Sequence, residues 1–127
     1  MEMNILVCDD EESVREVVSV ILEMEGYNVD TAKDGYEALQ MVLDQIGHYE
    51  LLLTDHKMPR LDGLRLVTEL RGFGFEGKII VLSGSIDQPE INAYKALDVD
   101  GILFKPFDFV EFRKTVSGLL SMHAHHV

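Results

Sequence analysis

The sequence predicts a three-layer α/β domain, in which helices cover both faces of a five-stranded parallel sheet. Five short apolar runs alternate with five helical patterns along the whole 127-residue chain, and this alternation is typical of parallel strands joined by helices. Several runs are apolar almost without interruption, as in strands that are buried on both faces. The chain length and a hydrophobic content of 46% fit one domain with a single core.

The first strand and the first helix come from residues 4–26. NILVC (4–8) is a short apolar run that ends at the acidic DDEE. The following helix has apolar residues at offsets of three, four and seven, namely Val14, Val17, Val18 and Ile21. Gly26 is placed to end this helix, because glycine readily adopts the conformation found just after a helix C-terminus. YNVDTA (27–32) alternates in polarity, which favours a second strand at the edge of the sheet.

The second helix is expected to begin at Asp34. Asp34 and Glu37 form a capping-box pattern, and Gly47 is placed to end the helix. The apolar positions of this helix are Ala38, Leu39, Val42 and Leu43. ELLLT (50–54) then provides the third strand, which is apolar on both faces.

The second half of the chain continues the alternation. KIIVL (78–82) and GILF (101–104) are the fourth and fifth strands, and Pro89 suits the first turn of the helix between them. The apolar residues of the three remaining helices are Leu64, Leu66, Val67 and Leu70; Ile91, Tyr94 and Leu97; and Phe109, Phe112, Val116, Leu119 and Leu120. The phenylalanines of the last helix are expected in the core. The predicted fold is a flavodoxin-like (βα)5 sandwich with the strand order 2-1-3-4-5.

The composition excludes several classes of protein. A net charge of −12 argues against nucleic-acid binding, which needs a clustered basic surface. No apolar run approaches the roughly 20 residues that a membrane-spanning helix needs, and the single cysteine, Cys8, favours a reduced, cytoplasmic setting. Cys8 itself is interpreted as a small buried hydrophobic residue. The histidine-containing end, 122–127, is expected to be a flexible tail after a domain of residues 1–121.

Polar residues follow four of the expected strands. Asp9 and Asp10 come after the first strand, Asp55 after the third, Ser83 after the fourth and Lys105 after the fifth. In a parallel α/β sheet these positions meet at one crevice, beyond the carboxyl ends of the strands. Three carboxylates that meet there repel one another, and a hard divalent cation such as Mg²⁺ offsets that repulsion through oxygen ligands. Asp55 can then act as a nucleophile that forms an acyl phosphate, with Lys105 neutralising the phosphoryl group.

The segments VCDDEE, LLLTDHKMPRLDGL, VLSGS and LFKPF, in this order, resemble the signature segments of the response-regulator receiver domain. The resemblance covers about residues 3–121, and the family includes the stand-alone chemotaxis regulators. It implies a signalling domain rather than an enzyme, with Asp55 as the site phosphorylated by a histidine kinase or a histidine phosphotransfer protein. It also implies a downstream protein that binds the face formed by the fourth helix, fifth strand and fifth helix.

The same resemblance assigns the site residues one by one. Asp9 and Asp10 match the acidic pair that holds Mg²⁺ or Mn²⁺ together with Asp55, and Lys57 matches the position whose backbone carbonyl completes the metal site. Ser83 matches the hydroxyl residue that bonds the phosphoryl group. Lys105 matches the family's lysine, and its bond to Pro106 is expected to be cis.

The switch region departs from the family pattern. Ser83 matches the hydroxyl residue that moves on phosphorylation, and Gly84 matches the next position, where the family uses a small side chain that keeps the phosphoryl group accessible. Ile102, however, stands where receivers usually carry an aromatic residue. The aromatic residue of this strand, Phe104, is expected to fill the core. A β-branched side chain has few χ1 states. The movement of an aromatic side chain is therefore expected to be absent or weakened here, with Ser83 and the loop 83–88 carrying most of the change.

Two other functions compete with signalling. A Mg²⁺-dependent phosphatase with an aspartyl nucleophile commonly needs a second aspartate two residues later, and Lys57 occupies that position. A non-phosphorylated interaction module of the same fold would be expected to lack one of the acidic residues or Lys105, and all are present. His56 could shuttle protons beside Asp55, but an ordinary packed or surface histidine is the favoured interpretation.

Overall fold

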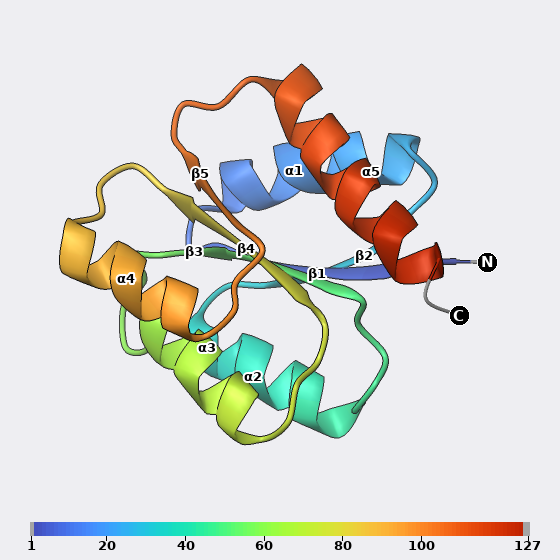
Figure 1. Cartoon of the computed structure of the whole chain (residues 1–127). Helices are drawn as coiled ribbons and strands as arrows, with labels where there is room; N and C mark the ends of the chain where they lie inside the picture. Colours follow the sequence, from blue (N-terminus) through green and yellow to red (C-terminus); the bar gives the residue numbers. More distant parts are fainter. Residues whose placement is uncertain (1, 126–127) are drawn as a thin grey trace.

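The structure is a computed structural model that describes residues 2–125, and it confirms the predicted fold (Figure 1). The strands are β1 (Asn4–Cys8), β2 (Asn28–Ala32), β3 (Leu51–Asp55), β4 (Lys78–Ser83) and β5 (Gly101–Phe104). The helices are α1 (Glu12–Met24), α2 (Gly35–Asp44), α3 (Gly63–Gly72), α4 (Gln88–Ala96) and α5 (Phe109–His125). All strand pairs are parallel, in the predicted order β2-β1-β3-β4-β5.

The sheet separates two apolar cores. In Figure 1, α1 and α5 lie on one face of the sheet, and α2, α3 and α4 lie on the other. Successive residues of a strand point to opposite faces, so Leu51 and Leu53 pack in the core beside α1 and α5, whereas Leu52 packs in the other. Both layers of helices therefore need apolar partners from the same strand. This requirement explains the uninterrupted apolar run that β3 carries in the sequence.

Side-chain caps set the starts of α2 and α4. The Asp34 carboxylate accepts a hydrogen bond of 2.8 Å from the Glu37 N–H, as predicted, but Glu37 accepts from the Lys33 N–H rather than closing a box on Asp34. The complete capping box lies at α4 instead. There the Asp87 and Glu90 side chains each accept from the other residue's N–H, and a proline occupies the first turn, where Pro89 was expected.

A single guanidinium joins three segments at the end of the sheet opposite the strand carboxyl ends. Arg71, in the last turn of α3, donates hydrogen bonds to the carbonyls of Phe75 and Gly77, just before β4. It also donates to the carbonyls of Leu97 and Asp98, which follow α4. Asp98 has a φ of 57°, so this arginine supports a turn in the left-handed region. The C-terminal end of α4 is thereby fixed to its surroundings.

Two aromatic residues predicted in the core are on the surface. Phe104 is 55% exposed because it ends β5, the strand at one edge of the sheet. Phe109 is 44% exposed because it is the first residue of α5, where the helix has only begun to cover the sheet. Phe112, one turn later, is fully buried as predicted.

The C-terminal boundary at residue 121 stays a prediction. The α5 backbone runs through His125, four residues into the segment predicted as a flexible tail. Residues 126–127 and the side chains of 122–125 lie outside the described part of the chain. Within residues 2–125, no helix combines the length and the apolar character needed to cross a bilayer.

Candidate phosphorylation and metal site

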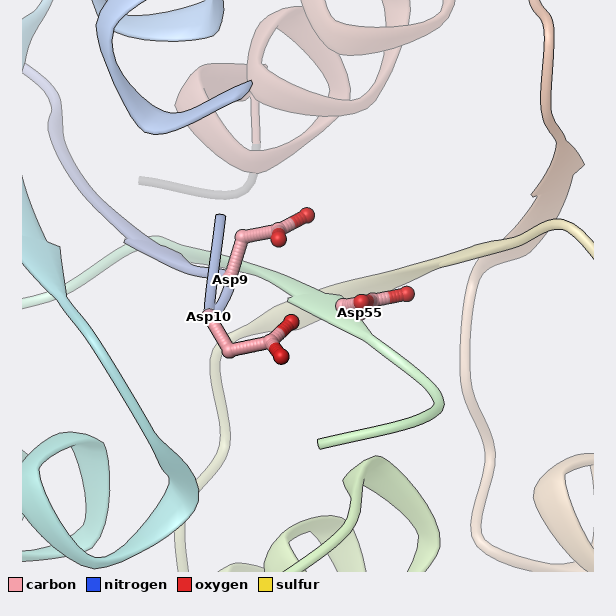
Figure 2. A group of neighbouring side chains, drawn as sticks. All are labelled: Asp9, Asp10 and Asp55. Atoms are coloured by element: carbon pink, nitrogen blue, oxygen red, sulfur yellow. The ribbon is translucent and has the colours of Figure 1, made fainter. Parts of the chain in front are cut away.

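Three aspartates meet where β1 and β3 end (Figure 2). Asp9 and Asp10 follow β1 directly, and Asp55 is the last residue of β3. Because β1 and β3 are paired in parallel, their carboxyl ends lie side by side. One carboxylate oxygen from each residue lies within 4.8 Å of the others. Asp9 and Asp55 are buried and Asp10 is exposed, so the cluster opens to solvent on one side.

Lys105 brings the only ammonium found within ion-pair distance of these carboxylates among the described residues. Its Nζ lies 3.2 Å from Oδ2 of Asp9 and 3.3 Å from Oδ1 of Asp55. The lysine follows β5, and its backbone N–H donates to the Ser83 carbonyl at 2.8 Å. The peptide bond from Lys105 to Pro106 is cis. The structure thus brings residues from three strand ends into one ionic cluster.

Backbone groups hold the two buried carboxylates in place. The Glu11 N–H donates to Oδ1 of Asp9, and the His56 N–H donates to Oδ1 of Asp55, both at 2.9 Å. Arg15, from α1, donates to the Asp9 carbonyl at 2.8 Å. Hydrogen bonds from fixed backbone donors lower the cost of burying a charge. The aspartates are therefore oriented before any ligand binds.

The cluster is nevertheless short of positive charge. Burial, reinforced by the nearby Asp9 carboxylate, raises the pKa of Asp55, and Lys105 offsets only part of this effect. Burial opposes the charge of Lys105, but attraction from Asp55 and Asp9 prevails and raises the pKa of its ammonium. Three carboxylates thus share one ammonium. The donor set is all oxygen, which fits a hard cation such as Mg²⁺ or Mn²⁺.

Asp55→Asn is expected to raise the melting temperature at neutral pH. Because the pKa of Asp55 is raised in the folded protein, the folded state binds this proton more tightly than the unfolded chain does. That contribution to stability is complete below the ordinary carboxyl pKa and is lost as the pH rises through the raised pKa. The uncharged amide of asparagine does not ionise, so the variant keeps the stability that wild type loses as the pH rises. Each kcal/mol gained in the free energy of unfolding raises the melting temperature by about 4 °C.

Thermal unfolding followed by circular dichroism from about pH 3 to pH 7 checks this expectation. The difference in melting temperature between Asp55→Asn and wild type should shrink as the pH falls. Asp44→Asn, at an exposed carboxylate in the last turn of α2, is the control and should show no such trend. A stability gain for Asp55→Asn that is the same at every pH would contradict the charge repulsion described above.

The remaining predicted residues lie around the cluster in different ways. Ser83 is buried at the end of β4, next to the residue that pairs with Asp55. Its hydroxyl donates to the Ser85 carbonyl at 2.9 Å and accepts from the Ser85 N–H at 3.2 Å. Gly84 and Lys57 are exposed. Ile102 is partly buried and packs against the core beside α4, whereas Phe104 faces solvent.

A histidine beside the cluster has partners that sequence analysis missed. His56 is 2% exposed, which agrees with a packed histidine. Its Nδ1 lies 2.6 Å from the Tyr94 hydroxyl and its Nε2 lies 2.9 Å from Oε2 of Glu90. Both partners come from α4. Glu90 and Tyr94 are four residues apart and so share one face of that helix, which is the one signal in the sequence that could have paired them.

Comparison with known proteins gives one consistent result. The family model described as "Response regulator receiver domain" matches residues 5–117. Response regulator MprA of Mycobacterium tuberculosis is 38% identical over 120 residues, which is 94% of this chain and 51% of that protein. MprA of Mycobacterium avium is also 38% identical, over 118 residues. The chain spans about half the length of the curated relatives it matches.

Solved structures with the same fold include regulators with detectable sequence identity. Chemotaxis protein CheY4 of Vibrio cholerae superposes with a TM-score of 0.85 at 29% identity, over 94% of this chain and 99% of that one. Response regulator TrrA of Thermotoga maritima, solved in complex with Mg²⁺ and BeF, gives a TM-score of 0.80 at 34% identity. That match covers 92% of this chain and 98% of TrrA.

Proposed function

Because the chain belongs to the response-regulator receiver domain family of two-component signalling proteins, we propose that Asp55 is its phosphorylated residue. The observation that carries this proposal is the ion pair of Lys105 with both Asp9 and Asp55 inside a cluster of three carboxylates. Asp55 is the member of the cluster at the centre of the sheet, since β3 lies between β1 and β4. Residues from both neighbouring strands can therefore reach a group attached to it.

The phosphoryl transfer proceeds by attack of an Asp55 oxygen on phosphorus. A new O–P bond forms while the bond from phosphorus to the donor breaks, and the leaving group keeps the electron pair. Both contacts of the Asp55 carboxylate described above engage Oδ1, so Oδ2 is the oxygen that can attack without losing a contact. Lys105 neutralises negative charge that gathers on the peripheral oxygens. The Ser83 hydroxyl donates to one of these oxygens once it has left Ser85.

A divalent cation would complete the site. Asp9, Asp10 and Asp55 would hold Mg²⁺ or Mn²⁺ with the Lys57 backbone carbonyl, and the bound ion would supply further neutralisation of the phosphoryl oxygens. The fit rests on the donor set, because three carboxylates converge within 4.8 Å with a single ammonium to balance them. Asp10 is exposed and remains open to a ligand.

The test is intact-protein mass spectrometry after incubation with a small acyl-phosphate donor. The protein should gain one phosphoryl group when Mg²⁺ is present and none when the cation is chelated. Hydroxylamine, which cleaves acyl phosphates, should remove the group. A phosphoryl group that survives hydroxylamine, or that forms equally well without a divalent cation, would refute an aspartyl phosphate at this site.

The partners proposed for this chain are proteins. The donor is a histidine kinase or a histidine phosphotransfer protein, which supplies a phosphoryl group on nitrogen. The response would pass to a downstream protein through the face formed by α4, β5 and α5, where Phe104 and Val110 are exposed apolar residues. The domain signals and does not turn over a separate substrate, and we place it in the cytoplasm, without direct binding to nucleic acid or membrane.

The conformational response is proposed to centre on the β4–α4 loop. Ser83 and Gly84 begin this loop, and Ser83 must exchange its Ser85 contacts for the phosphoryl group. Ile102 is partly buried and packs against the core, and its branched side chain has few rotamers. Phe104 lies on the surface and does not replace an inward-turning ring. We therefore expect the loop to move while Ile102 keeps its rotamer.

Lys57→Ala is expected to shorten the lifetime of the acyl phosphate by about two- to five-fold, the range of one exposed charge interaction. The long side chain of Lys57 is exposed two residues past Asp55. We infer that its ammonium approaches the phosphoryl oxygens and restricts the attacking water. Loss of the phosphoryl group is followed by mass spectrometry after removal of the donor. Lys114→Ala, at an exposed lysine of α5, is the control, and equal rates in both variants would contradict the inference.

A further inference from the structure

The His56 ring connects the end of β3 to α4 through two hydrogen bonds, of which the one to Tyr94 is buried and the one to Glu90 is partly buried. An ionised Glu90 only accepts, so the histidine Nε2 carries the hydrogen in the 2.9 Å contact to that carboxylate. In the neutral ring, Nδ1 then accepts from the Tyr94 hydroxyl at 2.6 Å. The His56 and Tyr94 rings also meet edge to face, with centroids 5.5 Å apart. Both polar atoms of the ring are therefore satisfied by α4.

The same Glu90 carboxylate also closes the cap of α4. Its Oε1 accepts from the Asp87 N–H at 3.1 Å, while its Oε2 contacts His56. The cap and the histidine contact consequently share one side chain. A movement of the helix start away from β3 must break the contact with His56 or the cap, or must reorient Glu90.

The loop from Ser83 to Asp87 is held at both of its ends by contacts with residues at or beside Asp55. At its start, Ser83 follows Leu82, which is the residue paired with Asp55. At its end, Asp87 is bound to Glu90, which His56 holds. Inside the loop the Ser83 hydroxyl bonds to Ser85. In this structure, His56 contacts α4 while the Ser83 hydroxyl is hydrogen-bonded to Ser85 within the loop.

We propose that His56 is a positioning residue whose ring ties the first turn of α4, through Glu90, and its last turn, through Tyr94, to the strand that carries Asp55 and thereby favours the arrangement in which Ser83 is bonded to Ser85. The inference rests on the proposed phosphorylation of Asp55 and adds a residue that sets how readily the site responds. A contact made in only one of two conformations biases the equilibrium toward that conformation. Weakening the contact should favour the arrangement in which Ser83 is released to the phosphoryl group.

The test compares the affinity of the protein for beryllofluoride with Mg²⁺, measured by isothermal titration calorimetry. Tyr94→Phe removes one hydroxyl and keeps the ring. It should bind the phosphoryl mimic about three- to ten-fold more tightly than wild type, the range that one hydrogen bond supplies. Tyr49→Phe is the matched control. Tyr49 is also buried and donates to Asp30 at 2.7 Å, but it precedes the opposite end of β3.

A purely structural role would lower the melting temperature of both phenylalanine variants and leave their affinities equal, and that result would overturn the proposal. His56→Leu provides a second arm, because it removes both contacts at once. If the histidine acts through Tyr94, adding Tyr94→Phe to His56→Leu should give no further gain in affinity. An additive gain would overturn the proposal. If His56→Leu does not fold, the beryllofluoride affinities of Tyr94→Phe and Tyr49→Phe are sufficient to test the proposal.

The same titrations separate this inference from the proposed function. Binding of beryllofluoride to wild type, and its loss in Asp55→Asn, supports the assignment of Asp55 whatever Tyr94→Phe does. Failure of wild type to bind the mimic would overturn the proposed function and this inference with it. Normal binding in wild type with no effect of Tyr94→Phe would overturn the inference alone.

Discussion

Asp55→Asn is expected to abolish phosphorylation by a small acyl-phosphate donor. The amide keeps the size of the side chain but is a far weaker nucleophile than a carboxylate. The backbone contact is preserved, because the amide oxygen can still accept from the His56 N–H. The loss is therefore chemical rather than structural. Intact-protein mass spectrometry should show no phosphoryl group in the variant under conditions that label the wild type fully.

Asp10→Asn is the companion variant, which tests the proposed metal ligand rather than the nucleophile. Asp10 is exposed and follows Asp9, so its substitution leaves the nucleophile and the Lys105 ion pairs in place. Labelling should slow strongly and should require a higher Mg²⁺ concentration, because one proposed ligand is weakened. Full labelling of Asp55→Asn would show that another residue accepts the phosphoryl group. Unchanged Mg²⁺ dependence of Asp10→Asn would remove Asp10 from the metal site.

Gly63→Ala is expected to destabilise the fold by about 3 kcal/mol, as over-packing of a rigid site does. Gly63 begins α3, and its N–H donates to the His56 carbonyl at 2.8 Å. A methyl group there would collide with the backbone oxygen of Asp55 and would lie 2.8 Å from the Tyr94 hydroxyl. Two of the three neighbours that it meets are backbone atoms. The strand end that carries Asp55 would have to shift to admit it.

Gly72→Ala is the matched control within the same helix. Gly72 ends α3, and a methyl group added there meets nothing within 4 Å. Alanine should be neutral or stabilising by up to about 0.5 kcal/mol through its higher helix propensity. Urea unfolding followed by circular dichroism measures both changes. Equal stabilities for the two variants would mean that the contact between α3 and the Asp55 strand is not as tight as described.

The parts of the fold that the sequence predicts well are those determined by local pattern. An apolar run such as Leu51–Leu53 is needed wherever a strand is covered on both faces, so the central strands could be inferred. The strand order was predicted from the fold type that the alternation of strands and helices indicates. The residues of the acidic site were predictable for a related reason. Asp9, Asp55 and Lys105 stand at strand ends, and parallel pairing brings strand ends together.

The errors concern features that depend on which element lies opposite. Phe104 has the apolar character of a core residue, but its exposure follows from its place at the end of an edge strand. The partners of His56 come from α4, more than thirty residues later in the chain. Only the packing of α4 against the sheet decides which of its faces meets β3. Likewise, the bond from Ser83 to Ser85 depends on the path of one loop.

The four hydrogen bonds of Arg71 determine how α4 can move. Two of the four hold the turn just after the helix through the carbonyls of Leu97 and Asp98, and the other two hold the segment before β4; the opposite end of α4 is held by Glu90 and its contacts with Asp87 and His56. A nine-residue helix is about 14 Å long. A rotation of about 10° around its anchored end would therefore carry the first turn by about 2 Å and leave the last turn nearly still. We therefore expect any movement of α4 to be largest at residues 88–91, while Arg71 keeps the turn after the helix in place.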